Sequence, residues 1–443
     1  MQILSKLHSI SRYGIPAVFL SSVTNKAIGF VSNMIVIRIL SVEEYGLQAS
    51  LYTVLSLIGL FAGGGMGSPL IIYGSEWRSP SEKNQIRIYT LYCGVLFSIL
   101  VGFIQILLGL FVFKDYPILH QYLPLLSMVP VISYINSYIQ ILMRTMQDNQ
   151  GYARLTFLHT LVGLVSTLCG IAIAGLSGLI WYRVIGSIFM ILIGMKMCPV
   201  KLDIGFDLQN FSLFKMLYPS GILKNMKSEL KKELWAFAIK AGLTSILNST
   251  VLYLDVFMIT MLLKDPELIA SYKIACLIPD NLNFLPGVLM IALVPRFAQC
   301  ANDKEWFKDR FKRLFIANLI VQGVISLFLI LFAREIITFL WTEKYLDSTL
   351  PFQILSFSYL WMAGIRIFST NMLSVLKKIT YNLFVSILLG IVNITLDLLL
   401  ITRWQMIGAA LATLFSVIFV SAMTFVYLIY VIYKSDQSKA AAE

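Results

Sequence analysis

Long apolar segments recur along the whole sequence, and short polar segments separate them. A helix needs about 20 mostly apolar residues to cross the hydrocarbon core of a bilayer, so each segment predicts a membrane-spanning helix. Twelve such helices are expected, at 13–39, 46–73, 88–113, 118–143, 155–174, 177–196, 235–263, 268–295, 314–333, 349–372, 380–401 and 406–433. The pattern therefore predicts an all-α membrane protein with twelve transmembrane helices, numbered below as spans one to twelve.

The basic residues indicate which ends of the spans face the cytoplasm. If the N-terminus is cytoplasmic, 24 of the 35 lysines and arginines flank the spans on the cytoplasmic side and five flank them on the outer side. Such an excess is what the positive-inside rule describes. Both termini are therefore expected in the cytoplasm, in agreement with an even number of spans.

Composition supports this class and excludes others. Of the 443 residues, 58% are hydrophobic and 13% are charged, whereas about a quarter of a typical soluble domain is charged. Cationic loops at a membrane explain the net charge of +12, so nucleic acid is not expected as a partner. The five cysteines lack the spacing of a metal site or a disulfide framework. We expect a multi-pass protein of the cell inner (cytoplasmic) membrane, in contact with membrane lipids.

Loop lengths divide the chain into two lobes of six spans. The longest loop, 197–234, is expected to be a cytoplasmic linker between an N-terminal lobe, 1–196, and a C-terminal lobe, 235–443. Every outer loop is short, so no catalytic domain is expected outside the membrane. Neither a Ser/His/Asp grouping nor a glycine-rich phosphate loop followed by Lys-Ser/Thr occurs, and no catalytic site is expected.

The two halves also resemble each other in pattern. Residues 31–73 and 252–297 each contain a span, a short acidic outer loop and a second span. In the second span, glycines (Gly63 to Gly67) interrupt the first copy and prolines (Pro279, Pro286) the second. Both copies run in the same direction, which is typical of transporters built from parallel repeats.

These segments carry a resemblance to a known family. The stretch IVIRILSVEEYGLQAS resembles the first outer loop of the polysaccharide flippases in the MOP superfamily, the Wzx-like O-unit exporters. The stretch LDVFMITMLLKDPELIASYKIA resembles the matching segment of their second half. The resemblance implies two six-helix lobes that face each other in a V, as in MATE exporters, and alternating access between them. It also implies a substrate, an undecaprenyl-diphosphate-linked oligosaccharide that moves from the cytoplasmic to the outer leaflet, and a place beside polysaccharide-assembly proteins such as those of O-antigen.

Ionisable residues inside spans are costly and mostly face a wet cavity or a charged partner. Nine lie within the predicted spans: Lys26, Arg38, Arg183, Lys240, Lys273, Arg366, Asp255, Asp280 and Asp397. Arg38, Lys273 and Asp397 are near outer ends of their spans, so mainly structural roles are expected for them. The remaining cations are candidates for binding the diphosphate of the substrate.

Span one carries the strongest candidate site. Lys26 lies at mid-depth, and Asn25 and Asn33 fall on the same helix face. We expect this face to line a central cavity and Lys26 to contact the diphosphate. The alternative is that Lys26 pairs with an acid between helices. Further candidates for substrate binding are Lys240, with the same structural alternative, Arg183 and Arg366.

Two carboxylates are candidates for coupling transport to a cation, H⁺ or Na⁺. Asp255 and Asp280 are the deepest acids, and Asp280 follows Pro279, which frees backbone carbonyls in the preceding turn. The alternative is a hydrogen-bonded helix break. No organic cofactor is expected. The polar residues of span four, Tyr134, Asn136, Tyr138 and Gln140, suit either sugars or hydrogen bonds between helices.

The leading hypothesis is therefore a flippase for a lipid-linked oligosaccharide, with cations in its lumen for the diphosphate. A MATE-like cation-coupled exporter of drugs or other small molecules is the alternative, but it would need acids in span one, which has lysine instead. A membrane polymerase or ligase of polysaccharide assembly is a weaker alternative, because that chemistry needs a substantial outer loop.

Overall fold

Helices make up all the regular structure of the computed structural model over the residues that it describes, which are 15–76, 78–198, 226–287, 290, 293, 297, 304–376 and 378–440. The first part of the chain forms α2 (Ile15–Ile39), α3 (Val42–Gly59), the 3₁₀-helix η1 (Ala62–Gly65), α4 (Gly67–Tyr73), α5 (Pro80–Leu107), the π-helix η2 (Leu108–Val112), α6 (Pro117–Leu125), α7 (Val129–Thr145) and α8 (Asn149–Met197). The second part forms α10 (Ser228–Leu263), α11 (Pro266–Leu282), α13 (Lys304–Leu331), α14 (Ala333–Trp341), the 3₁₀-helix η3 (Glu343–Ser348), α15 (Thr349–Tyr359), the π-helix η4 (Leu360–Arg366), α16 (Ile367–Val375) and α17 (Ile379–Ala440). The prediction of an all-helical chain is confirmed for these residues. Most of the predicted linker, 199–225, lies outside them.

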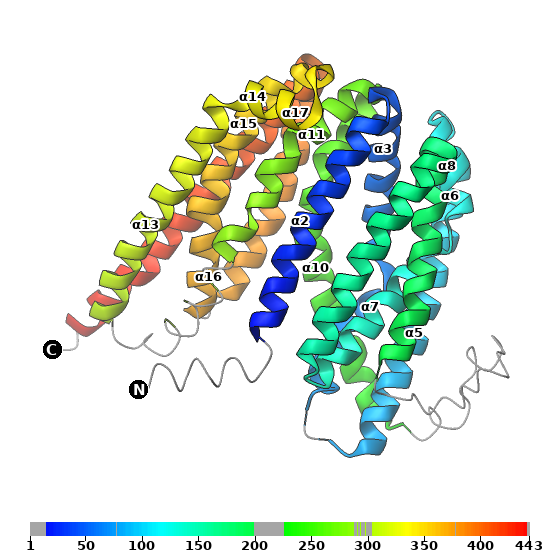
Figure 1. The fold of residues 1–443 in the computed structure, drawn as a ribbon. Coiled ribbons are helices and arrows are strands. Elements are labelled where there is room, and N and C mark those ends of the chain that lie inside the picture. The colour runs from blue at the N-terminus through cyan, green and yellow to red at the C-terminus, as the bar shows by residue number, and fades with distance from the viewer. Residues whose placement is uncertain are drawn as a thin grey trace. The chain divides into compact units, whose positions relative to one another are not determined.

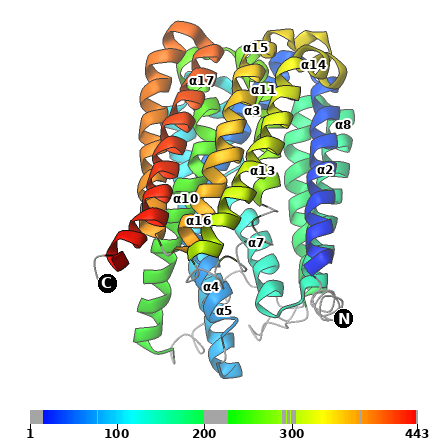
Figure 2. The ribbon, with the colours of Figure 1, turned by 90° about the vertical axis from the view of Figure 1, so that its left-hand side faces the viewer.

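Two long helices, α8 and α17, are hairpins. In α8 the backbone turns at Gly175 (φ 56°), and Gly170 and Gly178 pack so closely that neither has room for a Cβ (Figure 1). In α17 the turn is at Gln405 (φ 50°), and Gly408 packs against the backbone of Leu400 (Figure 2). Glycine reaches a positive φ at no steric cost, which explains the turn in α8. Each hairpin covers the residues of two predicted spans, five and six in α8 and eleven and twelve in α17.

The segment predicted as span two is broken by its glycine run. Gly63, Gly64 and Gly65 adopt φ values of 73°, 55° and 75°, and α3 bends by 41° relative to the helical segment Ala62–Tyr73. The backbone N–H of Gly63 donates to the Ser98 hydroxyl of α5 at 2.8 Å, which replaces one lost helical bond. A Cβ at Gly63 would collide with the Tyr134 ring of α7. The glycines thus serve both the break and close packing.

Length and composition agree with a membrane protein. Among the described residues, four helices are long and apolar enough to cross a membrane, and three sharply bent helix pairs would each add one crossing. Two of those four helices are α8 and α17, the hairpins described above. The twelve crossings, the V-shaped pair of lobes and the cytoplasmic termini stay predictions.

The chain forms two compact units. Unit 1 comprises Met1–Leu40 and Val54–Ile246, and unit 2 comprises Ser41–Thr53 and Leu247–Glu443. These units differ from the lobes of the sequence analysis at two places. The start of α3 belongs to unit 2, and the first half of α10 belongs to unit 1.

Close backbone contacts explain both assignments. Gly46 of α3 lies against the backbone of Pro266 at the start of α11, where a Cβ would not fit. Gly65 of η1 likewise lies against the backbones of Ala238 and Gly242 in α10. Glycine at these crossings lets the helix backbones approach each other, as small residues do in membrane proteins.

Candidate functional site

Two aspartates of unit 2 meet between α10 and α17. The side chains of Asp255 and Asp397 lie close enough to interact. The Tyr272 hydroxyl of α11 donates a hydrogen bond to Asp255 Oδ2 at 2.6 Å, and the Thr413 hydroxyl donates to the same oxygen. Asn393 also interacts with Asp255. These five residues are called the carboxylate cluster below.

Four oxygen atoms of the carboxylate cluster are buried and accept no hydrogen bond from any described residue. They are Asp255 Oδ1, both carboxylate oxygens of Asp397 and Asn393 Oδ1. A buried carboxylate without a partner is costly, and two neighbouring carboxylates repel each other. A small cation would relieve both costs, because the cluster offers it oxygen ligands and negative charge. The donor set therefore suits a proton or Na⁺.

Four members of the carboxylate cluster, all except Asp397, line a cavity of about 70 Å³ within unit 2. Asp280 and Lys273 of α11 line the same cavity, and Asp280 is exposed. The structure thus brings both predicted coupling residues, Asp255 and Asp280, to one cavity. Sequence analysis missed Asp397, because its position near the end of span eleven suggested a structural role. The available signal was its spacing of four from Asn393, which puts both on one helix face.

Arg366 is the last residue of η4, a short π-helical turn inside the segment predicted as span ten. Asn318 of α13 donates to the carbonyls of Ala363 and Gly364 in this turn, at 3.2 and 3.0 Å. Gln322 donates to Asn318 at 3.3 Å and accepts from the Tyr359 hydroxyl. These three polar residues are called the amide clamp. π-turns inside α-helices often mark functional sites.

The guanidinium of Arg366 has few partners. One of its N–H groups contacts the Met362 sulfur, with Nη1 and Sδ 3.6 Å apart. Its Nε is buried without a hydrogen-bond partner among the described residues. Since a buried N–H group without a partner is unfavourable, Arg366 is suited to bind an anion.

The other predicted substrate-binding residues are more exposed. Lys26 is an exposed side chain of α2, the helix that packs along α8 (Figure 1). Beside it, Asn25 and Asn33 are half-buried, and Asn25 Oδ1 accepts no hydrogen bond within the described part of the chain. Arg183 of α8 and Lys240 of α10 are exposed. None of these side chains lines the cavity of the carboxylate cluster or the larger cavity of unit 1.

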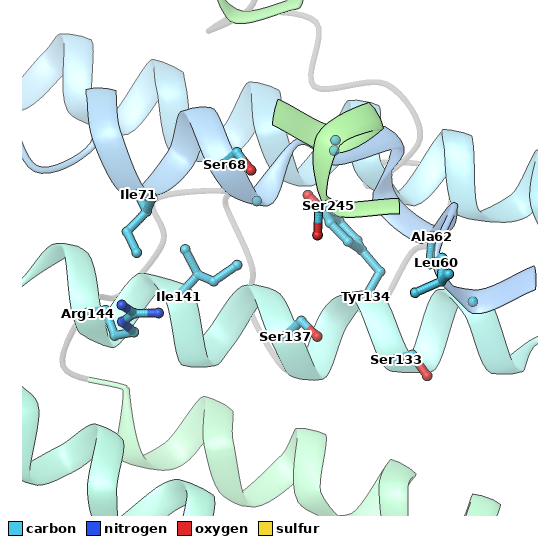
Figure 3. Close-up of a pocket in the computed structure, with 14 residues that line it drawn as sticks. Leu60, Ala62, Ser68, Ile71, Ser133, Tyr134, Ser137, Ile141, Arg144 and Ser245 are labelled. Atoms are coloured by element: carbon cyan, nitrogen blue, oxygen red, sulfur yellow. The ribbon is translucent and has the colours of Figure 1, made fainter. Parts of the chain in front are cut away.

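The cavity of unit 1 has a volume of about 410 Å³ and runs along one face of α7 (Figure 3). Ser133, Ser137, Ile141 and Arg144 follow one another along that face (Figure 3). Small residues make up much of the remaining wall: Gly59, Ala62, Gly65, Gly67, Ser68, Gly242 and Ser245. This space is called the serine cavity below, and sequence analysis did not identify it.

The polar residues that sequence analysis noted in span four have mostly structural partners. Tyr134 and Tyr138 donate to the backbone carbonyls of Thr90 and Arg87 in α5, at 2.6 and 3.0 Å. Asn136 donates to the carbonyl of Ser187 in α8 at 3.0 Å. Of these three residues, Tyr134 also lines the serine cavity, together with Ser133 and Ser137 of α7.

Comparisons with known proteins agree with this fold. The family model of a polysaccharide biosynthesis protein matches residues 35–350. No curated protein matches the chain in sequence. Among solved structures, the lipid II flippase MurJ in an inward closed conformation aligns with a TM-score of 0.72 at 14% identity, over 94% of this chain and 87% of that one.

Two other solved structures show the same fold. A multidrug resistance MATE transporter of the MOP superfamily, inward-facing, aligns with a TM-score of 0.72 at 12% identity, over 93% of this chain and 96% of that one. A MOP superfamily transporter from Pyrococcus furiosus, whose binding pocket is described as reversed in polarity, aligns with a TM-score of 0.62 at 12% identity, over 96% and 95%. The chain thus shares its fold with membrane transporters. The chain belongs to the polysaccharide biosynthesis protein family and has the fold of the MOP superfamily.

Proposed function

We propose that the chain is a flippase that moves an undecaprenyl-diphosphate-linked oligosaccharide from the cytoplasmic to the outer leaflet of the inner membrane. The family it belongs to is one of polysaccharide biosynthesis, and a lipid flippase shares its fold. The substrate is a large amphiphile with a diphosphate near the membrane surface. Alternating access would pass this charged head through the protein while the lipid tail stays in the bilayer.

The observation that carries this proposal is Arg366. It is a guanidinium in a predicted span, its Nε is buried without a partner, and no described acid pairs with it. A diphosphate supplies the acceptors that such a group needs, and guanidinium binds phosphate oxygens in a bidentate way. A cationic drug would be repelled by the same group. The alternative of a MATE-like exporter is therefore disfavoured.

We further propose that Lys26, Asn25 and Asn33 on α2, with Lys240 and Arg183, form the rest of the path for the charged head. Lys26 and Lys240 are exposed and contribute positive charge. The exposed Arg183 lies on α8, the helix along which α2 packs. This assignment is supported by charge and exposure, and Lys26 is the residue of the group that is best suited to contact phosphate.

The carboxylate cluster is proposed as the coupling site, with Asp255 and Asp397 as the binding carboxylates. A proton or Na⁺ would bind to its four unpartnered oxygens. In transporters of this kind, coupling ions bind where helices are interrupted and polar groups converge. Asp280 lies on the wall of the same cavity and would be the entry or exit position for the cation.

The proposal is tested with the purified chain in proteoliposomes that contain the lipid-linked oligosaccharide. The measured quantity is the fraction of oligosaccharide that becomes accessible to a membrane-impermeant glycosidase. Arg366→Ala should abolish the increase, and Arg366→Lys should restore part of it, because charge returns without the bidentate geometry. Arg334→Ala, in the outer segment α14, is the matched control. Equal accessibility with wild-type chain and with empty liposomes would refute the flippase assignment.

The same liposomes distinguish the alternatives. Efflux of a cationic dye against its gradient, without movement of the lipid, would favour the drug exporter. Growth of the oligosaccharide chain would favour a polymerase or ligase. Neither is expected if Arg366, whose Nε is buried without a partner among the described residues, binds the diphosphate.

A further inference from the structure

The serine cavity has a chemical character that differs from the carboxylate cluster. Among the described residues that line it, Arg144 is the one charged side chain, and none is an acid. Ser133, Ser137 and Ser245 are exposed, and their hydroxyls have no hydrogen-bond partner among the residues that the structure describes. Hydroxyls both donate and accept, so this wall suits a ligand that carries many hydroxyl groups.

The geometry along α7 separates two kinds of contact. Ser133 and Ser137 lie one turn apart, and Arg144 follows Ser137 by seven residues, or about 10 Å along the axis. Figure 3 shows Arg144 at one end of this row and Ser133 at the other, with Ser68 and Ser245 on the facing helices. A ligand in the cavity would therefore meet hydroxyls along most of its length and positive charge at one end.

Arg144 is held in a way that leaves its N–H groups available. Its guanidinium carbon lies 5.6 Å from the centre of the Tyr152 ring, a cation–π contact that fixes the side chain through its face. No hydrogen bond of its N–H groups is formed with a described residue, and the side chain is exposed. A phosphate fits this position, because arginine binds phosphate through its N–H edge.

The size of the cavity is also suitable. Its 410 Å³ fall in the range of small-molecule sites, about 300–1,000 Å³. Ile71 and Ile141 give one side of the wall an apolar surface, and the Tyr134 ring lies among the serines (Figure 3). A mixed wall of hydroxyls, an aromatic ring and aliphatic groups matches a sugar, whose two faces are less polar than its edges.

We propose that the serine cavity binds a glycosyl phosphate, namely the sugar next to the phosphate in the lipid-linked oligosaccharide. The serines of α7, α4 and α10 take the sugar hydroxyls, and Arg144 takes the adjacent phosphate. This subsite deepens the proposed function and rests on it for the source of the ligand. It places the recognition of the first sugar in unit 1.

Gly59 provides a way to fill the cavity without disturbing the fold. It lines the cavity, and a Cβ built on it meets no atom within 4 Å. Gly59→Leu therefore adds bulk in open space. Gly163→Leu is the matched control, since a Cβ on Gly163 also meets nothing within 4 Å and Gly163 lines neither cavity.

The experiment measures binding to the full-length chain in nanodiscs by titration calorimetry. The ligands are an undecaprenyl-diphosphate-linked sugar, undecaprenyl diphosphate without sugar, and a soluble glycosyl-1-phosphate. Gly59→Leu should lower the affinity for the sugar-bearing lipid by about tenfold or more. It should change the affinity for the sugar-free lipid by less than about twofold. Ser133→Ala and Ser137→Ala should each lower the affinity for the sugar-bearing lipid by about threefold to tenfold, as expected for a lost hydrogen bond. Arg144→Lys should lower the affinity for the soluble glycosyl-1-phosphate. If Arg144 serves only to orient the protein in the membrane, lysine should replace it without effect.

Each outcome has a defined meaning. Unchanged affinity of the sugar-bearing lipid for Gly59→Leu overturns the subsite. Equal affinities for the soluble glycosyl-1-phosphate and the lipid-linked sugar overturn the lipid as its source. Binding that responds to Gly59→Leu without any flipping in proteoliposomes supports the subsite and refutes the proposed function. Flipping that is unaffected by Gly59→Leu and Arg144→Lys refutes the subsite and leaves the function standing.

Discussion

Replacing Asp397 by asparagine tests whether the carboxylate cluster holds a cation. Asparagine keeps the shape of the side chain but removes one of two neighbouring buried charges. We expect the cation-free protein to become more stable, because Asp255 then has no like charge beside it. We also expect its stability to stop depending on the concentration of the coupling cation, because half of the binding charge is lost.

The expected size follows from the repulsion between neighbouring carboxylates. Two like charges about 4–6 Å apart repel by about 3–4 kcal/mol at an effective dielectric constant of about 20, which is an upper limit because a shared proton relieves it. A cation at one hundred times its Kd stabilises the folded state by about 2.7 kcal/mol. Asp255→Asn should stabilise the cation-free protein less than Asp397→Asn does. Asp255 accepts hydrogen bonds from Tyr272 and Thr413, each worth about 1.5–3 kcal/mol when the acceptor is charged.

The assay is thermal unfolding of the purified chain in detergent, followed by tryptophan fluorescence. The Tm is measured while Na⁺ replaces choline at constant ionic strength, and separately while the pH falls. A Tm that rises with Na⁺ indicates a sodium site, and a Tm that rises as the pH falls indicates a proton site, since the ion that binds the folded state stabilises it. Asp347→Asn, an exposed acid in η3, is the control and should respond like the wild type. A wild-type response from Asp397→Asn would refute the cation site.

Three further predictions concern the substrate path and the topology. Lys26→Ala should abolish export of surface polysaccharide at a normal membrane level, and Lys26→Arg should keep part of it; a low level rescued by changing an acidic partner would instead show a structural ion pair. Asn318→Leu should lower the free energy of unfolding by about 1–3 kcal/mol, because it removes two hydrogen bonds to the π-turn, and it should slow flipping although Arg366 is unchanged; flipping at the wild-type rate would show that the amide clamp does not position Arg366. A reporter fused near Lys224 should be cytoplasmic and one near Glu343 should be outside, and the opposite reading at either position would refute the twelve-span topology.

The apolar pattern predicted the helices well and their ends less well. Span nine was predicted to begin at 314, but α13 begins at Lys304. The sequence from Lys304 to Arg313 is rich in charge, so the apolar pattern did not include it in a span. In the structure Phe307 and Phe311 are buried in a core cluster of unit 2 together with Phe368. Tertiary packing of two aromatic residues thus continues the helix through the charged stretch, and a hydropathy pattern does not contain that information.

The candidate sites were only partly predictable for a related reason. Depth in a span can be read from the sequence, and it singled out Asp255 and Lys26. Which spans pack against each other cannot be read in this way. Asp397 follows Asp255 by 142 residues and meets it only because α17 packs beside α10 and α11. The serine cavity was missed because placing a serine inside a span costs little free energy. Unlike a charged residue, a serine there does not indicate a functional site.

The predicted internal repeat would give the two cavities a common origin, although their chemistry differs. Span two and span eight are expected to be equivalents in the repeat. Span two is interrupted at Gly63–Gly65, and α11 continues through Pro279 and ends at Leu282, within span eight. Residues of span two line the serine cavity of unit 1, and residues of span eight line the cavity of unit 2. The wall of the unit 1 cavity carries hydroxyls and an arginine, and the wall of the unit 2 cavity carries two aspartates and a lysine. If a duplicated helix interruption makes room for a ligand in each unit, then the side chains on that wall decide which ligand enters. The cavity of unit 1 would then select the glycosyl phosphate, and the cavity of unit 2 would bind the cation that drives transport. Exchanging the charges on the two cavity walls should therefore impair substrate binding in unit 1 and coupling in unit 2 separately.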